Sequence, residues 1–98
     1  MAIVGYGERG ISGVTEGQRE AIEEAMKLIL EEDQDRGIGP DAQFECPGCH
    51  ETRGEAGAVT YEDIRLCNAC ATRFEVERTA RQVRSSAEYV RRRTQRTA

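Results

Sequence analysis

The sequence is poor in the side chains that build a large hydrophobic core. Its 98 residues are 5% aromatic and 38% apolar, with no tryptophan, whereas 33% are charged. A chain of this size and composition supports one small domain with a thin core, and such domains usually depend on a covalent or metal cross-link. The four cysteines are the residues that can supply one, either as disulfides or as metal ligands.

Signals for export and for membrane insertion are also missing. The first seven residues, MAIVGYG, have no basic start, and no apolar run reaches the length of a signal peptide or of a membrane span. We therefore expect a cytoplasmic protein without membrane association, whose cysteines stay reduced. Because no catalytic triad, paired acid and base, or phosphate-cradling loop is detectable, we expect no enzymatic activity.

The cysteines form two closely spaced pairs. Cys46 and Cys49, followed by Cys67 and Cys70, give C-x2-C-x17-C-x2-C, a spacing typical of zinc sites. Two residues between thiolates let one tight turn direct both sulfurs to a single ion, and 17 intervening residues suffice for a hairpin that returns the second pair. The sequence predicts one structural Zn²⁺ bound by all four cysteines, with no coordination position open for catalysis.

Other uses of these residues remain open at the level of sequence. Residues 46–50 read CPGCH, which is also a haem attachment motif with Met26 as a distant axial candidate, but that motif leaves the second cysteine pair unexplained. A thioredoxin-like dithiol would need a βαβ pattern that neither pair has, and iron bound by four thiolates is chemically feasible. His50 is a further candidate ligand, although a surface residue tolerating an unusual backbone angle is the preferred interpretation.

The clearest predicted helix lies within residues 15–37. Thr15 and Gln18 form a capping box, and apolar residues recur at helical spacing between positions 21 and 30. Gly37 suits a left-handed C-cap and Pro40 prevents continuation, so this amphipathic helix should span about residues 16–36. The preceding residues 1–14 predict a flexible glycine-rich arm; they include a short strand at 3–4 and a G-x-G-x-x-G at 5–10 that lacks the surroundings of a dinucleotide site.

The second half of the chain predicts a finger followed by a helix. Residues 43–72 form the four-cysteine finger, with a turn at 54–57 and a short ribbon of strands at 59–61 and 64–66. Residues 73–98 predict one long arginine-rich helix and tail, with a heptad-like stripe of Val76, Ala80, Val83, Ala87 and Val90. The fold class is a small α+β protein with a treble-clef-like or ribbon-like finger. Because the side chains of this stripe bury little apolar area, the last helix should pack against the finger, the first helix, or a second copy of the chain in a homodimer.

Charge is distributed unevenly along the chain. Residues 1–72 carry 6 basic and 15 acidic side chains, a balance of −9, whereas residues 73–98 carry 8 arginines and 3 glutamates, a balance of +5. The candidate contact residues are Arg78, Arg81, Arg84, Arg91, Arg92, Arg93 and Arg96. They form either a solvated helix face or a surface for phosphate groups or an acidic protein. Tyr89 is the one aromatic residue among them, so any nucleic-acid binding should be electrostatic and salt-sensitive.

Two families resemble this arrangement. The segment from Leu66 to Cys70, LCNAC, placed 17 residues after a C-x2-C pair, resembles the second half of a GATA-type zinc finger. That resemblance implies that the four cysteines are ligands, that a helix starts at the second pair and that the basic tail helps to contact DNA. The layout of helix, finger and helix is similar to the DksA and TraR family, which implies binding to RNA polymerase.

The sequence thus leads to two functional hypotheses. The first is a small zinc-binding regulatory protein associated with transcription, which binds RNA polymerase or DNA. The alternative is a protein-protein adaptor or assembly subunit in which zinc is purely structural.

Overall fold

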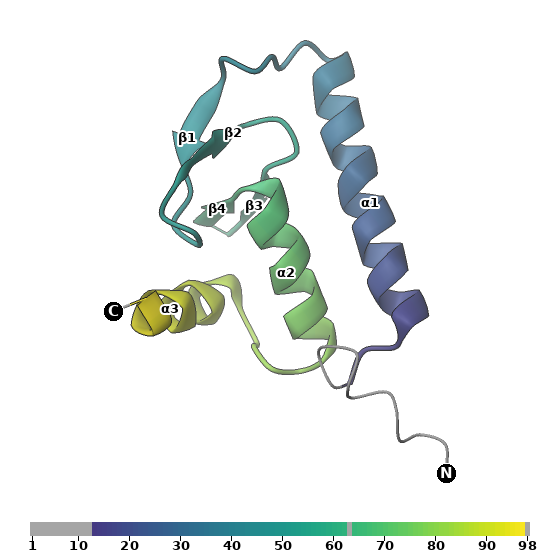
Figure 1. Cartoon of the computed structure of the whole chain (residues 1–98), viewed down its shortest axis with the longest axis vertical. Helices are drawn as coiled ribbons and strands as arrows, with labels where there is room; N and C mark the ends of the chain where they lie inside the picture. Colours follow the sequence, from purple (N-terminus) through teal and green to yellow (C-terminus); the bar gives the residue numbers. More distant parts are fainter. Residues whose placement is uncertain (1–12, 63, 98) are drawn as a thin grey trace.

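The computed structural model of the chain describes residues 13–62 and 64–97, with side chains up to residue 94. The predicted arm, with its strand at 3–4 and its glycine motif, lies almost entirely outside the described residues. A small α+β architecture is confirmed (Figure 1). The elements are α1 (Glu16–Asp35), β1 (Gln43–Glu45), β2 (Thr52–Gly54), β3 (Val59–Tyr61), β4 (Ile64–Leu66), α2 (Asn68–Thr79) and α3 (Ser86–Thr97). The strands form two antiparallel hairpins, β1 with β2 and β3 with β4.

Helix α1 begins and ends as its local sequence predicts. The Thr15 side chain accepts a hydrogen bond from the Gln18 backbone at 3.0 Å, and the Gln18 side chain accepts one from the Thr15 backbone at 3.0 Å. At the other end Gly37 has a φ of 100°, and the Ile38 N–H donates to the Asp33 carbonyl at 3.1 Å, which closes a Schellman motif. None of the helices in the described ranges combines the length and apolarity needed to cross a membrane.

The prediction of one long C-terminal helix is wrong. Helix α2 ends at Thr79, and Arg81 takes a left-handed φ of 64°. The Arg81 N–H donates to the Arg78 carbonyl and the Gln82 N–H to the Glu77 carbonyl, both at 2.9 Å. This pair of bonds is again a Schellman motif, with arginine in the place where glycine is usual. The chain therefore leaves the helix where sequence periodicity continues it.

A new helix cap then starts α3. The Ser85 hydroxyl accepts from the Glu88 N–H at 3.1 Å, and the Glu88 carboxylate accepts from the Arg84 N–H at 2.8 Å. Ser85 and Glu88 have the spacing of a capping box, a local signal that the heptad-like pattern obscured. The stripe is consequently divided between two helices and the connector between them, residues 80–85. Val83 is buried in this connector, whereas Ala87 on α3 is exposed. A homodimer built on one continuous stripe therefore lacks the helix it requires.

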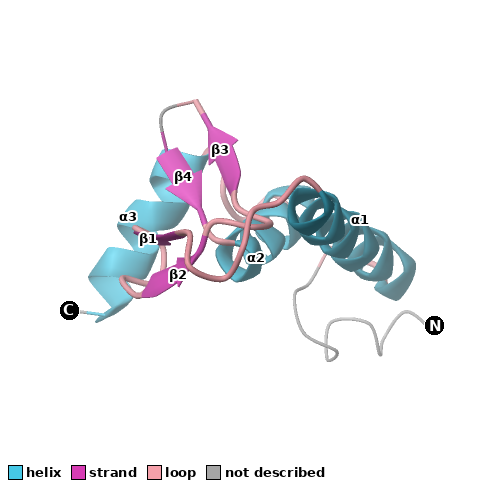
Figure 2. Ribbon diagram, turned by 90° about the horizontal axis from the view of Figure 1, so that it is seen from above, coloured by secondary structure: helices cyan, strands magenta, loops and turns pink. Residues whose placement is uncertain are grey.

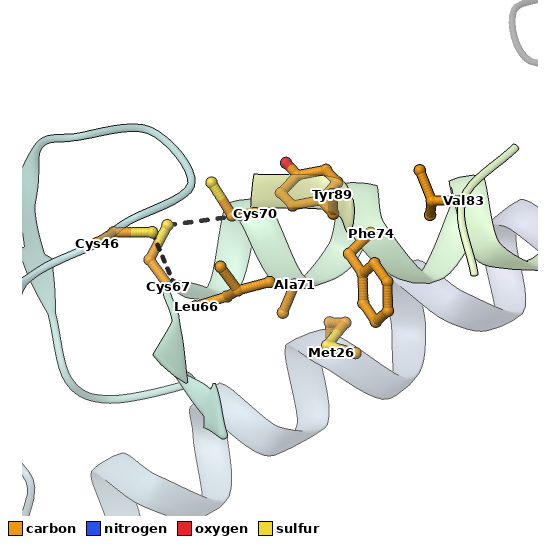
Figure 3. Packing of buried hydrophobic residues seen from close by; sticks show 9 residues of the cluster. All are labelled: Met26, Cys46, Leu66, Cys67, Cys70, Ala71, Phe74, Val83 and Tyr89. Carbon is orange, nitrogen blue, oxygen red and sulfur yellow. Dashed lines mark hydrogen bonds between the residues drawn. The ribbon is translucent and has the colours of Figure 1, made fainter. Parts of the chain in front are cut away.

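Helix α2 lies between the other two helices and carries the centre of the core (Figures 1 and 2). The Phe74 ring packs edge-on against Tyr61, with centroids 4.8 Å apart, and against Tyr89, with centroids 5.8 Å apart. Met26 adds a contribution from α1. The buried cluster, drawn in Figure 3, consists of Met26, Cys46, Leu66, Cys67, Cys70, Ala71, Phe74, Val83 and Tyr89. Three of the four cysteines are thus part of a thin core.

Asn68 joins α1 to the finger. Its side-chain amide donates to the Met26 carbonyl of α1 and to the Gly57 carbonyl, both at 3.0 Å. The Gly57 N–H donates in turn to the Asp33 carboxylate of α1 at 2.8 Å. Gly57 has a φ of 82°, and a Cβ at this position would lie 2.8 Å from the Asn68 amide nitrogen and 3.1 Å from Leu30 Cβ. The joint therefore requires glycine for both its backbone conformation and its close approach.

Replacing Gly57 by alanine should loosen this joint. Gly37→Ala is the matched control, because Gly37 also has a positive φ but a Cβ there meets nothing within 4 Å. We expect Gly37→Ala to cost about 1 kcal/mol of unfolding free energy and Gly57→Ala about 3 kcal/mol, since only the second adds a steric clash. Urea titration followed by circular dichroism measures both values. Equal losses would contradict the role assigned to the joint.

Candidate metal centre

The four cysteine sulfurs form one cluster. All four Sγ atoms lie within 4.8 Å of one another. Cys46, Cys67 and Cys70 are buried, Cys49 is half-buried, and all four are free thiols. A tetrahedral ion with metal–sulfur bonds of about 2.3 Å requires sulfurs about 3.8 Å apart, which is compatible with this cluster. The donor set and its geometry therefore fit a metal ion such as zinc.

A tight turn at residues 46–50, called the knuckle below, connects β1 to β2 and positions Cys46 and Cys49. Beyond the paired residues of β1 and β2, the Cys46 N–H donates to the Glu51 carbonyl at 2.9 Å, and the His50 N–H donates to the Cys46 carbonyl at 2.7 Å. His50 has a φ of 61°, which confirms its interpretation as a residue with an unusual backbone angle. Its side chain is exposed, lies outside the sulfur cluster and contacts Thr94, with Nε2 and Oγ1 3.3 Å apart.

Gly48 allows the knuckle to approach the second cysteine pair. A Cβ at this position would lie 2.9 Å from Cys70 Sγ and 3.2 Å from a Leu66 methyl carbon. The Gly48 N–H also donates to Cys46 Sγ at 3.3 Å. A side chain would occupy the space in which the two pairs meet, so the proline-glycine sequence of the knuckle serves the cluster directly.

The start of α2 positions the other two cysteines. Cys67 is the N-cap, and its sulfur accepts from the Cys70 N–H at 3.5 Å. The Cys67 N–H donates across to Cys46 Sγ at 3.3 Å (Figure 3). The positive end of α2 therefore lies beside sulfurs that carry negative charge when they bind a metal. This placement of the second pair at a helix start was predicted from the sequence.

Ionisation of the cluster is uneven. Burial raises the pKa values of Cys67 and Cys70, and the sulfur of Cys46 raises them further. Burial acts in the same direction on Cys46, but backbone N–H groups of Cys67, Cys49 and Gly48 outweigh it and lower the Cys46 pKa to about 7. Close, buried thiols resist carrying several negative charges together, and a divalent cation removes that resistance.

Two residues that sequence reasoning missed adjoin the cluster. The Arg53 side chain donates from Nε to Cys49 Sγ at 3.4 Å and also contacts Glu51 at 3.3 Å, so it places a positive charge beside a ligand. Tyr89 has no exposed surface, and its hydroxyl has no hydrogen-bond partner among the described residues. Burial raises the pKa of Tyr89, and the neighbouring Cys70 adds to this rise. Tyr89 reaches the site through tertiary packing, whereas the β1–β2 hairpin brings Arg53 back to Cys49, four residues before it.

The haem and dithiol hypotheses, which use only one cysteine pair, do not account for this geometry. A haem attached through the CPGCH segment would need access to both of its cysteine sulfurs, whereas Cys46 is completely buried against the second pair. A dithiol that works alone leaves the contribution of Cys67 and Cys70 unexplained. The arrangement instead favours one centre formed by all four residues.

Three of the candidate contact arginines are engaged within the molecule. Arg78 contacts the Glu75 carboxylate at 2.6 Å and lies 5.0 Å above the Phe74 ring. Arg92 donates to the Gln82 carbonyl at 2.5 Å. Arg93 donates to the Gly48 carbonyl at 3.4 Å. These side chains position α2 and α3 in addition to carrying charge.

The remaining arginines differ from this group. Arg81, Arg84 and Arg91 are exposed, and their side chains form no ion pair within the part of the chain that the structure describes. The side chain of Arg96 lies outside the described residues. The available contact residues therefore lie at the end of α2, in the connector and on α3.

Comparison with known proteins identifies no relative of this chain. No protein-family model matches the chain, and neither the curated proteins nor the solved structures contain a significant match. The resemblances noted for the finger rest on its residues alone. Arguments about function therefore depend on the geometry described above.

Replacing Cys67 by serine should remove the centre. We expect Cys67→Ser to lose tight metal binding and cooperative unfolding together, because metal-binding energy is largely folding energy in domains this small. Metal analysis and thermal melts followed by circular dichroism check both effects. His50→Ala is the control and should keep the metal, since His50 lies outside the cluster. A native melt in the serine variant would contradict the structural role.

Metal affinity should fall as the pH falls. Cys67 and Cys70 have raised pKa values, so both are protonated near neutral pH and must release their protons when they bind an ion. Each released proton makes the affinity about tenfold weaker per unit decrease in pH, so these two thiols alone give at least about 100-fold. Competition with a zinc chelator between pH 8 and pH 7 measures this change. An affinity independent of pH would exclude thiols as the ligands.

Proposed function

We propose that this chain is a small zinc-stabilised regulatory protein associated with transcription, which binds RNA polymerase or DNA and is not an enzyme. The observation that carries the proposal is the closed cluster of four cysteines next to a helix that bears exposed arginines. Such a cluster serves to hold a binding surface in place. The proposed location is the cytoplasm, where reducing conditions preserve free thiols.

The proposed metal is one structural Zn²⁺ held by Cys46, Cys49, Cys67 and Cys70. Four thiolates with tetrahedral spacing are the donor set of structural zinc sites. The order of knuckle, hairpin and helix, with the second pair at the helix start, supports the treble-clef alternative over the ribbon. When bound, zinc would supply cross-linking and charge neutralisation.

The ligand set argues against catalysis. A catalytic zinc keeps a coordination position for water or substrate, and four protein thiolates leave none. Three of the four sulfurs are also committed to the fold, because Cys46, Cys67 and Cys70 belong to the buried core. A binding role is the one that such a closed centre supports.

Charge separation supports a contact surface on the side of α3. Helix α1 carries eight acidic and two basic side chains, whereas α3 carries four arginines and one glutamate. The two helices lie on opposite sides of α2 (Figures 1 and 2). Phosphate groups or an acidic protein surface are therefore attracted to α3 and repelled by α1.

A gel-shift titration against salt tests the nucleic-acid form of this proposal. The variant is Arg84→Ala with Arg91→Ala, and the control is Arg19→Ala with Arg36→Ala, which removes the same charge from α1 and its C-cap residue. For duplex DNA each lost phosphate contact should lower the log-log salt slope by about 0.9, so the first variant should lose about two units and the control almost none. Equal slopes in both variants would exclude the assigned surface.

A pull-down with purified RNA polymerase tests the protein form. The wild type and the α1 control variant should be retained by the polymerase, whereas the α3 variant should be retained less. Absence of both a gel shift at low salt and polymerase binding would overturn the transcriptional proposal.

A second candidate function has its own observation. Leu28 on α1 is 47% exposed and is the exposed large hydrophobic residue of the described chain. Ala25 and Ala21, about one and two helical turns before it, are exposed as well. An apolar strip of this kind suits a protein partner, as in an adaptor or assembly subunit in which zinc is purely structural. Loss of partner binding in Leu28→Glu, with unchanged metal content, would favour this function.

A further inference from the structure

Helix α3 is attached to the metal-binding loops by polar contacts. Arg93 donates to the Gly48 carbonyl at 3.4 Å, and the oxygen of Thr94 lies 3.3 Å from the His50 ring nitrogen. Gly48 and His50 both belong to the knuckle that carries the first cysteine pair. These contacts exist only while the knuckle keeps its shape.

The apolar attachment of α3 is narrow. Tyr89 is fully buried against Phe74, and Val90 is half-buried. Ser86 at its start is also buried but is polar, whereas Ala87, Arg91, Arg92 and Thr94 are exposed. A helix of 12 residues is marginal in isolation. The folding of α3 therefore depends on how well Tyr89 is accommodated.

The Tyr89 hydroxyl points to the same part of the core as the Cys70 side chain (Figure 3). It is fully buried, and no group in the described chain pairs with it in normal hydrogen-bond geometry. A buried donor of this kind is destabilising unless it finds an acceptor. The neighbouring Cys70 sulfur becomes a much better acceptor as a metal-bound thiolate than as a thiol.

We propose that Tyr89 is a positioning residue of the metal centre, whose hydroxyl donates a hydrogen bond to the metal-bound sulfur of Cys70 and thereby makes the docking of α3 depend on the metal. This inference rests on the proposed zinc and is independent of any nucleic acid or polymerase. Metal binding then fixes the arginines of α3 beside the first knuckle. Metal loss weakens the acceptor for Tyr89 and removes the shape of the knuckle that Arg93 and Thr94 contact.

Two tyrosine variants test the hydrogen bond. Tyr89→Phe removes the proposed donor, whereas Tyr61→Phe removes a hydroxyl that donates to Glu75 at 2.6 Å, away from the cysteines. Both rings pack edge-on against Phe74, so the two variants are matched in their apolar surroundings. Chelator competition should show that Tyr89→Phe weakens Zn²⁺ binding by about 10-fold to 100-fold, whereas Tyr61→Phe leaves it unchanged.

Cobalt gives a spectroscopic readout of the same bond. A donor stabilises the sulfur lone pairs, so its removal should move the thiolate-to-cobalt charge-transfer band of Tyr89→Phe to longer wavelength. The band of Tyr61→Phe should stay in place. A purely structural effect of losing the Tyr89 hydroxyl would not produce this difference.

Hydrogen exchange tests the coupling to α3. In the wild type, amides of residues 86–97 should be protected with Zn²⁺ and lose protection with a chelator. In Tyr89→Phe this protection should already be reduced with zinc bound. Unchanged protection of α3 after metal removal, wild-type affinity in Tyr89→Phe, or an equal loss in Tyr61→Phe would overturn the inference. A wild-type chain that binds no Zn²⁺ would overturn the proposed metal as well, which separates the two failures.

Discussion

The structure depends on two cysteine pairs that meet in one cluster, where we propose that they hold one cation. Cys46 and Cys67 are 21 positions apart, yet the backbone of one donates to the sulfur of the other. Three of the cysteines also belong to the buried cluster, so the residues that would form the cross-link are part of the hydrophobic core. A chain with so few aromatic residues gains little from apolar burial alone, and the proposed metal would supply further free energy of folding.

Closing the centre requires that negative charge be compensated in a small volume. Backbone N–H groups, the start of α2 and the Arg53 guanidinium all face the sulfurs. They stabilise individual thiolates, but a divalent ion is needed to hold four of them together. The molecule is divided by charge: an acidic helix packs on one side of α2, and an arginine-bearing helix contacts the cysteine loops on the other. The proposed contacts with polymerase or nucleic acid use this separation.

The sequence predicted those features that have local or strictly chemical signals. Thr15, Gln18 and Gly37 mark the ends of α1, and the β3 and β4 strands occupy the predicted residues. The four cysteines were identifiable because a metal tolerates few ligand spacings. In contrast, β2 is fully exposed and has no alternating pattern, so its pairing with β1 gives no sequence signal.

The break between α2 and α3 was missed for a different reason. The residue with the left-handed backbone conformation is Arg81, and arginine has no preference for that conformation that could have predicted it. Ser85 and Glu88 did provide a signal, which the apolar periodicity outweighed. Tyr89 reaches the centre only after the chain has folded, so no sequence spacing reveals it. Arg53 is close to Cys49 in sequence, but its contact depends on the pairing of β1 with β2, which gave no sequence signal.

Native mass spectrometry of the purified chain tests the central claim most directly. The account predicts one zinc ion per chain, with all four cysteines protected from alkylation, and unfolding of the chain when a chelator removes the ion. A folded chain without bound metal, or one linked to a porphyrin, would contradict it.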